Sequence, residues 1–439
     1  MAKPKLWLGL STVGIVLTSL FLAGRDLATV NAGLINDQLG LSTQRIGTID
    51  SAEVEGSAYK DAKGSLSDEG WYEMIADSYK FCEEAVEQGS VLLKNENNAL
   101  PLGKEERHVT LLGQGSKNLF MRSGAGGAAP NPNLKVTLDK AFKNSGFFIN
   151  KTIFDKYAKL TGRQMTTPST KVEADYKASL YDQDVIDSFK DYSDAAIITF
   201  VRIGTEDSDP PAKQLDIKDD EIKVLELAMA QKKAGVFKKI IVLINSPMPM
   251  SMDWVNNPDY GIDACVYVGV PGYYGAGGIP HVLAGEKPRT EYDPGEKKMV
   301  PQTRPDGSTV MEVVNPSGHL VDTFASNASS SAAYQNFGNN SVVVYKEGVY
   351  VGYKYYETRY EDAVLGQGNA TGKNGSSNKQ EDWDYAREMG YPFGYGLSYG
   401  NFEQKITELK YNASDDTITA TVDVENKGDM NGKQRRHEW

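Results

Sequence analysis

The feature that most constrains the fold is a nearly uninterrupted apolar stretch, Ala195–Val201, which stops abruptly at a polar loop. An apolar run of this length, bounded by a turn signal, is typical of a strand buried on both faces in a parallel sheet. The loop carries Arg202, Glu206, Asp207 and Asp209. Ligands of open α/β sheets bind beyond the carboxyl ends of the strands, so these side chains are candidates for ligand chemistry. The alternative interpretation is a solvated acidic loop.

Composition excludes several classes of function. The chain has 439 residues, of which 40% are hydrophobic and 24% charged, and its net charge is −12. These values are typical of a folded globular protein of two or three domains, and they argue against a nucleic-acid partner. Two cysteines, Cys82 and Cys265, do not make a disulfide framework. The four histidines show no metal-ligand spacing, so no metal is expected.

No cofactor is predicted either. The segment from Gly113 to Asn118 begins like a dinucleotide-binding motif, but it lacks the third glycine. No acidic residue follows a second strand about 20 positions later. This partial match therefore gives little support to nucleotide binding.

The N-terminus has the pattern of a targeting segment. Lys3 and Lys5 precede an uncharged apolar run from Leu6 to Ala23. This pattern is typical of a secretory signal, and the run is close to the roughly 20 residues that span a bilayer. Residues 1–25 are thus interpreted as a cleaved signal peptide or an uncleaved membrane anchor, and both alternatives stay open. Either one predicts a secreted protein, or a membrane-anchored one with an extracytoplasmic body.

Strands and helices are expected to alternate through the middle of the chain. Residues 26–80 are interpreted as a linker and the start of a lead-in helix. This helix is expected to be capped by Ser67 and to end at Gly89. Further strands are expected at 109–113, 195–201, 239–245 and 263–269, with helices at 136–144, 219–234 and 275–284. This order predicts an α/β fold with a doubly wound, mostly parallel sheet sandwiched by helices. Its polar loops, 124–127, 204–209, 246–254 and 269–275, then fall at one sheet edge.

Regular patterning weakens after Gly285. Residues 286–313 are polar and rich in Pro and Gly, which predicts a surface insertion, and 368–379 is typical of a flexible loop. The tyrosines between 345 and 356 could form a sugar platform, although packing is the favoured interpretation. Residues 406–411 and 417–425 alternate in polarity and predict the opening strands of a β-sandwich that the chain does not complete.

A set of short motifs, in order, resembles one known family. The motifs are Ser90–Asn95 with Ala99–Leu102, the Gly124–Gly127 loop, Arg202 with Glu206 and Asp209, Asn245 with Trp254, Pro271-Gly272, Asn315–Gly318, Glu347–Tyr353 and Pro392–Tyr399. Together they resemble the C-terminal α/β domain of glycoside hydrolase family 3, assigned here to residues 81–400. Residues 401–439 resemble the start of a fibronectin-III-like domain, with Glu425–Asp429 as its strand-turn signature.

The resemblance implies hydrolysis of O-glycosyl bonds by an exo-acting, retaining, β-glucosidase-like enzyme. Such enzymes use two carboxyl groups about 5 Å apart. By motif match the acid/base is Glu206, and the match implies substrate binding by Arg202, Asp209, Gly124, Gly126 and Gly127. The alternative for Arg202 and Asp209 is an ion pair that shapes the loop. Thr205 and Asp207 stand where the family commonly has glycines.

In this family the nucleophilic aspartate lies in a (β/α)₈ barrel, and some members are circularly permuted. The stretch between the leader and Ser67 is far shorter than the roughly 250 residues of such a barrel. The expectation is therefore a permuted, truncated chain that lacks the barrel and is inactive alone. Its partners would be a β-glucoside-like carbohydrate and the missing barrel. The alternative is a non-catalytic, exported carbohydrate-binding or scaffold protein.

Overall fold

The computed structural model describes residues 3–30, 32, 67–121, 135–159, 177–204, 214–331, 333–334, 342, 344–345, 347–368, 384–428 and 430–432. The chain divides into two compact units. One comprises Met1–Leu66 with Gly127–Ala129, and the other comprises Ser67–Gly126 with Pro130–Trp439.

The described part of the first unit is essentially one helix, α1 (Lys3–Val30). Among the helices that the structure describes, none combines the length and the apolar character needed to cross a bilayer. The predicted apolar membrane anchor therefore receives no support from the structure.

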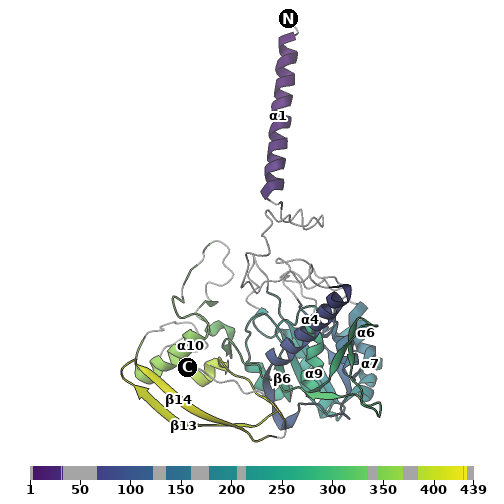
Figure 1. Ribbon diagram of the computed structural model, residues 1–439, viewed down its shortest axis with the longest axis vertical. Helices are drawn as coiled ribbons and strands as arrows, with labels where there is room; N and C mark the ends of the chain where they lie inside the picture. Colours follow the sequence, from purple (N-terminus) through teal and green to yellow (C-terminus); the bar gives the residue numbers. More distant parts are fainter. Residues whose placement is uncertain are drawn as a thin grey trace. The chain divides into compact units, whose positions relative to one another are not determined.

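The second unit is built on a six-stranded sheet (Figure 1). Its strands are β1 (Val91–Asn95), β2 (His108–Leu112), β3 (Phe148–Ile149), β4 (Ala195–Val201), β5 (Ile240–Asn245) and β6 (Ala264–Tyr267). The spatial order is β1-β6-β5-β4-β2-β3, and every neighbouring pair is parallel except β1 with β6. The predicted mostly parallel α/β sheet is confirmed, with an antiparallel strand at one edge.

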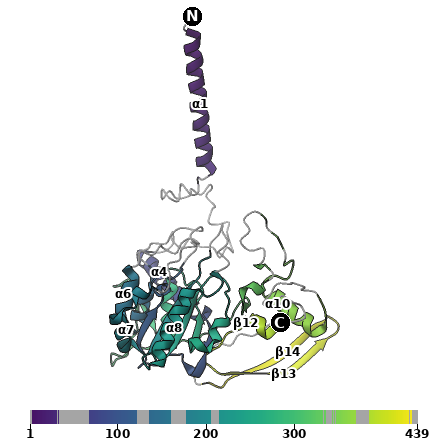
Figure 2. The same cartoon turned by 180° about the vertical axis from the view of Figure 1, so that it is seen from behind.

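Helices cover both faces of this sheet (Figures 1 and 2). One face packs against residues of α6 (Lys151–Lys159), α7 (Gln183–Ser188) and α8 (Asp219–Lys233). The other packs against α4 (Asp68–Gly89), α5 (Leu138–Asn144) and α9 (Gly278–Ala284). With both faces covered, all the residues of β4 and β5 are buried, which explains their continuous apolar sequence.

The first turn of α4 is capped as the sequence predicts. The Ser67 Oγ accepts a hydrogen bond from the backbone N–H of Gly70 at 3.1 Å. This bond satisfies one of the donors that the start of a helix leaves without a partner. The lead-in helix therefore begins and ends at its expected residues.

The segment 286–313, predicted as an irregular surface insertion, is more regular than expected. It forms one antiparallel ribbon of β7 (Glu286–Pro288) with β10 (Met311–Val313), and a second of β8 (Thr290–Asp293) with β9 (Lys298–Pro301). The turn of the second ribbon is held by Asp293, whose Oδ1 accepts from the N–H groups of Gly295 and Glu296 at 2.7 and 3.1 Å. An Asx turn of this kind specifies a tight reversal without an apolar pattern.

Smaller elements follow the ribbons. The strand β11 (Phe324–Ala325) pairs with β12 (Met389–Tyr391), near α10 (Tyr353–Leu365) and α11 (Tyr385–Glu388). Within the tyrosine-rich segment, Tyr355 and Tyr356 are buried, and the Tyr356 hydroxyl lies 2.9 Å from the Ser330 Oγ. These two tyrosines pack, as favoured above, whereas Tyr345 is exposed.

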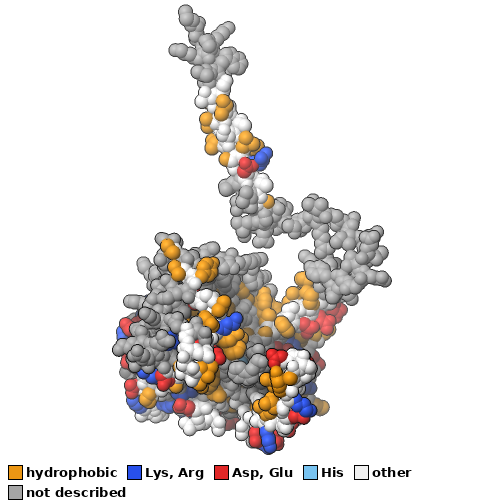
Figure 3. Space-filling model, turned by 90° about the vertical axis from the view of Figure 1, so that its left-hand side faces the viewer, with side chains coloured by type: hydrophobic (Ala, Val, Ile, Leu, Met, Phe, Trp, Pro, Cys, Tyr) orange, Lys and Arg blue, Asp and Glu red, His pale blue; other side chains and the backbone are white. Residues whose placement is uncertain are grey.

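The last described elements are two long antiparallel strands, β13 (Phe402–Asn412) and β14 (Thr417–Asn426), which confirm the strands expected there. One face of this hairpin carries Ile406 opposite Val422 and Tyr411 opposite Ile418, all of them exposed. Figure 3, which faces the side of the molecule where the hairpin lies, shows apolar side chains at the surface. The hairpin is compatible with an opening sandwich, but the described residues do not include a complete one.

Candidate active site at the sheet edge

Asn245, the last residue of β5, ties together the loops at the carboxyl edge of the sheet. Its Oδ1 accepts from the backbone N–H of Phe120 at 2.6 Å. Its Nδ2 donates to the carbonyl oxygens of Phe120 at 3.1 Å and Gly269 at 2.6 Å. The buried side chain thus joins the segments that follow β2, β5 and β6. Of the loops predicted to share this edge, 246–254 and 269–275 begin here, whereas 124–127 lies outside the described residues.

The glycines after β2 serve close packing against β4. A Cβ atom added to Gly115 would lie 2.3 Å from the carbonyl oxygen of Thr199. The next residue, Ser116, donates from its Oγ to the Leu112 carbonyl at 2.7 Å and lies 3.1 Å from the Thr199 Oγ1. The partial glycine motif is therefore explained by contact between two backbones, which only glycine permits at this distance.

Gly115→Ala is expected to destabilise the chain by about 1–3 kcal/mol, the usual cost of overpacking, because the strand of Thr199 cannot move without disturbing the sheet. The matched control is Gly89→Ala, since no atom lies within 4 Å of a Cβ added there. Urea unfolding followed by circular dichroism measures both. Equal midpoints for the two variants would contradict the close approach.

Arg202, the first residue after β4, is buried and paired with a residue that the sequence reasoning missed. Its Nη1 donates to the Glu221 Oε1 at 2.6 Å and its Nη2 to the Glu221 Oε2 at 2.8 Å. The two side chains are 1% and 0% exposed. A signal for this partner was present in the sequence, because Glu221 precedes Val224, Leu225 and Ala228 at the spacing of one buried helix face.

The charges of the pair compensate each other. Burial alone would raise the pKa of Glu221, but the charge and hydrogen bonds of Arg202, helped by Lys218, hold that pKa below its ordinary value. The carboxylate is therefore ionised at neutral pH, and it neutralises the guanidinium through two parallel hydrogen bonds.

This pair also anchors the loop that carries the predicted acid/base. The described chain leaves β4 through Gly204 and resumes at Gln214, so Glu206 and Asp209 lie outside the described residues. Where the chain resumes after the loop, Arg202 donates to the Asp216 carbonyl at 2.8 Å, and the Ser251 Oγ donates to the Asp216 carboxylate at 2.5 Å. Both ends of the loop are thus held beside the carboxyl end of β4.

The glycine loop is anchored in a comparable way at one end. Gly124, Gly126 and Gly127 lie outside the described residues, but the chain enters their segment directly after Phe120 and Met121. Because Phe120 is held by Asn245, this loop starts at the same edge as the Glu206 loop. Of the predicted site residues, the structure describes Arg202 alone.

The described residues offer no cluster of metal ligands. In the described part of the chain, no three His, Cys, Asp or Glu side chains gather closely enough to hold an ion. The described edge is built instead from hydrogen-bonded side chains and from the compensated Arg202–Glu221 pair.

Comparisons with known proteins agree with this architecture. The chain is 26% identical over 364 residues to the thermostable β-glucosidase B of Acetivibrio thermocellus, covering 81% of this chain and 38% of that protein. It is 25% identical over 367 residues to a β-glucosidase of Ruminococcus albus, covering 82% of this chain and 32% of that one. The chain therefore spans about a third of the length of these relatives.

Solved structures show the same fold. A β-glucosidase from Paenibacillus barengoltzii superposes with a TM-score of 0.57 at 24% identity, covering 80% of this chain and 33% of that one. The β-glucosidase 3B of Thermotoga neapolitana, in complex with glycerol, gives 0.56 at 24% identity, covering 80% and 41%.

The family model described as the glycosyl hydrolase family 3 C-terminal domain matches residues 90–353. This match includes all six strands of the central sheet and the Asn245 and Arg202–Glu221 contacts, whereas α4 precedes it. The chain belongs to glycoside hydrolase family 3, through that family's C-terminal domain.

Proposed function

We propose that this chain supplies the acid/base domain of a retaining, exo-acting β-glucosidase, with Glu206 as the proton donor and acceptor. The observation that carries the proposal is the anchoring of the Glu206 loop at both ends beside β4, at the edge where α/β sheets bind ligands. Family membership supports the reaction class. Export through the N-terminal segment is part of the same proposal.

The mechanism requires a carboxyl group that is protonated when the glycosidic bond breaks. Glu206 would protonate the leaving oxygen while a carboxylate nucleophile attacks the anomeric carbon, and it would then deprotonate the water that releases the sugar. For this role its pKa must rise toward neutrality. A nearby free arginine would oppose that rise, but the charge of Arg202 is balanced by Glu221. The pair thus removes an electrostatic obstacle to the role of Glu206.

The nucleophile is proposed to come from a (β/α)₈ barrel, which is not among the described residues. The partial coverage of the relatives and solved structures is consistent with this proposal. Val321, Val349, Val351 and Phe393 expose apolar side chains that such a domain would cover. The ring of Phe393 stacks on Tyr353, the first residue of α10, at 4.1 Å.

The hairpin of β13 and β14 fits the start of a fibronectin-III-like sandwich in the same proposal. A two-stranded hairpin is at best marginally stable alone, and its apolar face requires a cover. Ile406, Tyr411 and Ile418 would be covered by the second sheet of the sandwich.

The stereochemistry of hydrolysis tests the proposed function. The full chain, combined with a (β/α)₈ barrel of the same family, is expected to release β-glucose first from an aryl β-glucoside, because two successive displacements retain configuration. Proton NMR of the anomeric signals during the first minutes measures the product. Release of α-glucose as the first product, or no hydrolysis by the assembled protein, would contradict the proposal.

A further inference from the structure

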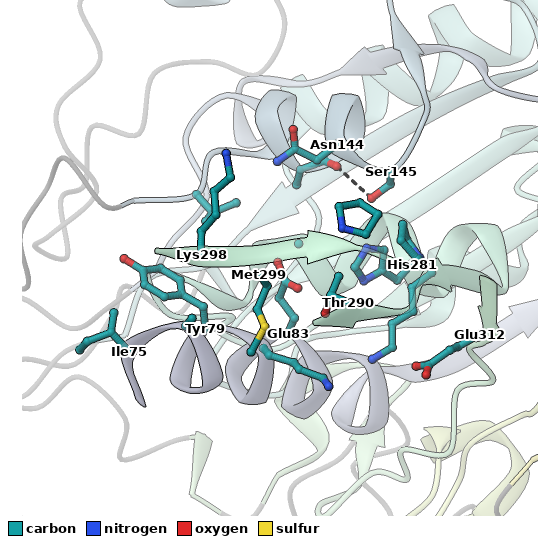
Figure 4. A pocket seen from close by; sticks show the side chains of 18 of the residues that line it. Ile75, Tyr79, Glu83, Asn144, Ser145, His281, Thr290, Lys298, Met299 and Glu312 are labelled. Atoms are coloured by element: carbon teal, nitrogen blue, oxygen red, sulfur yellow. Dashed lines mark hydrogen bonds between the residues drawn. The ribbon is translucent and has the colours of Figure 1, made fainter. Parts of the chain in front are cut away.

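A second concave site lies on the helical face of the domain, away from the residues that build the sheet edge. A cavity of about 540 Å³ opens between α4, α5 and the ribbon of β8 with β9 (Figure 4). Its volume falls within the range of about 300–1,000 Å³ that is usual for sites of small ligands. None of its lining residues belongs to the Asn245 or Arg202–Glu221 contacts. Its described lining therefore does not overlap the contacts that anchor the proposed active-site loops.

The central polar group of this cavity is Glu83, on α4 (Figure 4). Within the described chain, the Glu83 carboxylate accepts no hydrogen bond and forms no ion pair. Its neighbour Glu87 is fully engaged, by the His281 Nδ1 at 2.7 Å and the Lys287 Nζ at 2.8 Å. Burial raises the pKa of Glu83 and outweighs the opposing charges of His281 and Lys287.

The backbone facing this carboxylate is shaped to accommodate it. A Cβ atom added to Gly277, just before α9, would lie 2.0 Å from the Glu83 Oε1. The carboxylate therefore occupies the space that a side chain at position 277 would fill. Any residue but glycine there would displace Glu83 from its position in the cavity.

The remaining wall supplies donors and apolar surface. Lys80, Asn144 and Thr290 line the cavity, and the structure gives none of their side chains a hydrogen bond to another described residue. Figure 4 shows Tyr79 and Glu83 on α4, with Asn144 at the end of α5 across the opening. Between these polar groups lie apolar side chains, among them Ile75 and Met299.

We propose that this cavity binds a neutral, polyhydroxylated ligand, namely a sugar residue, at a non-catalytic site. An anionic ligand would meet the Glu83 carboxylate, and a cationic ligand would meet the Lys80 ammonium. The other two lysines at the opening have partners, because Lys297 lies over the Tyr72 ring and Lys298 pairs with Glu296 at 3.0 Å. A sugar hydroxyl can donate a hydrogen bond to a carboxylate and at the same time accept one from an ammonium or amide group. A sugar can therefore pair with the carboxylate and with the donor side chains that line the cavity. The C–H groups of the ring then contact the apolar side chains.

Isothermal titration of the full chain with cellobiose and with glucose tests this inference. The unmodified chain is expected to bind at least one of the two, and Glu83→Gln is expected to weaken that affinity about 10-fold, because a charge-assisted hydrogen bond is replaced by a neutral one. Glu73→Gln is the matched control on the same helix, because Glu73 is exposed and does not line the cavity. It is expected to leave the affinity unchanged.

Two further variants make the outcome decisive. Ile75→Trp fills the cavity without touching its charges and is expected to abolish the binding, with circular dichroism confirming that the chain is folded. Glu206→Gln tests the sheet edge, so the inference and the proposed function can fail separately. The inference is overturned if neither sugar binds, if Glu83→Gln and Ile75→Trp both retain full affinity, or if inorganic phosphate or putrescine binds here in place of the sugars.

Discussion

Arg202→Met is expected to lower the free energy of unfolding by about 3–5 kcal/mol, since it leaves the Glu221 carboxylate buried without its partner. Solvent does not reach either side chain, so water cannot replace the lost hydrogen bonds. The double variant Arg202→Met with Glu221→Leu removes both charges and is expected to recover most of this loss, because buried ion pairs and apolar replacements are often equally stable. Urea unfolding of the full chain measures each variant.

A surface pair provides the control. Lys151 and Asp155 on α6 form an ion pair of 3.0 Å between exposed side chains. Lys151→Met is expected to change the free energy of unfolding by at most about 1 kcal/mol, the usual value of exposed pairs. If Arg202→Met and Lys151→Met had the same urea midpoint, the buried Arg202–Glu221 pair would contribute no more to the free energy of unfolding than an exposed pair. That result would contradict the prediction.

The pH dependence of stability gives a second readout of the same pair. The folded pKa of Glu221 is below its ordinary value, which in the unfolded chain is about 4.3. The stabilisation is therefore fully present above about pH 4.3, and it is lost as the pH falls through the folded pKa. The double variant lacks this acid-dependent contribution, so its urea midpoint is expected to fall less steeply below pH 4.3.

Glu206→Gln is expected to reduce the hydrolysis of cellobiose by the assembled enzyme about 10²–10⁴-fold, the usual contribution of general acid–base catalysis. Glutamine has the same shape but cannot donate a proton to the leaving oxygen. Glu226→Gln, on the exposed side of α8, is the control and is expected to keep the full rate. Retention of the full rate by Glu206→Gln would remove this residue from the mechanism.

The central part of the fold was predictable because its strands are buried on both faces. The boundaries of β4 match the predicted strand, and those of β5 differ by one residue, since burial demands a continuous apolar sequence. The edge strand β1 carries no comparable signal. Val91–Asn95 is short, and its antiparallel pairing with β6 joins residues that are far apart in the sequence. That pairing becomes visible only when the sheet is assembled.

The candidate site was predictable in position but less so in its contacts. Motif order placed Arg202 at the end of β4, where the structure has it. Local reasoning considered Asp209, the nearer acid, as its partner, whereas Glu221 is brought to Arg202 by the packing of α8 on β4. A buried glutamate in the first turn of a helix looks like an ordinary helix-start acid until tertiary contacts are known. The role of Glu206 stays a prediction.

The dependence of the rate on the leaving group tests the account most directly. In the proposed mechanism, cleavage of cellobiose by the assembled enzyme would need a proton from Glu206, whereas 2,4-dinitrophenolate would depart from its β-glucoside without one. The account predicts that Glu206→Gln strongly reduces the pre-steady-state release of glucose from cellobiose but leaves the release of dinitrophenolate nearly unchanged. An equal reduction for both substrates would contradict the assignment of Glu206 as the proton donor.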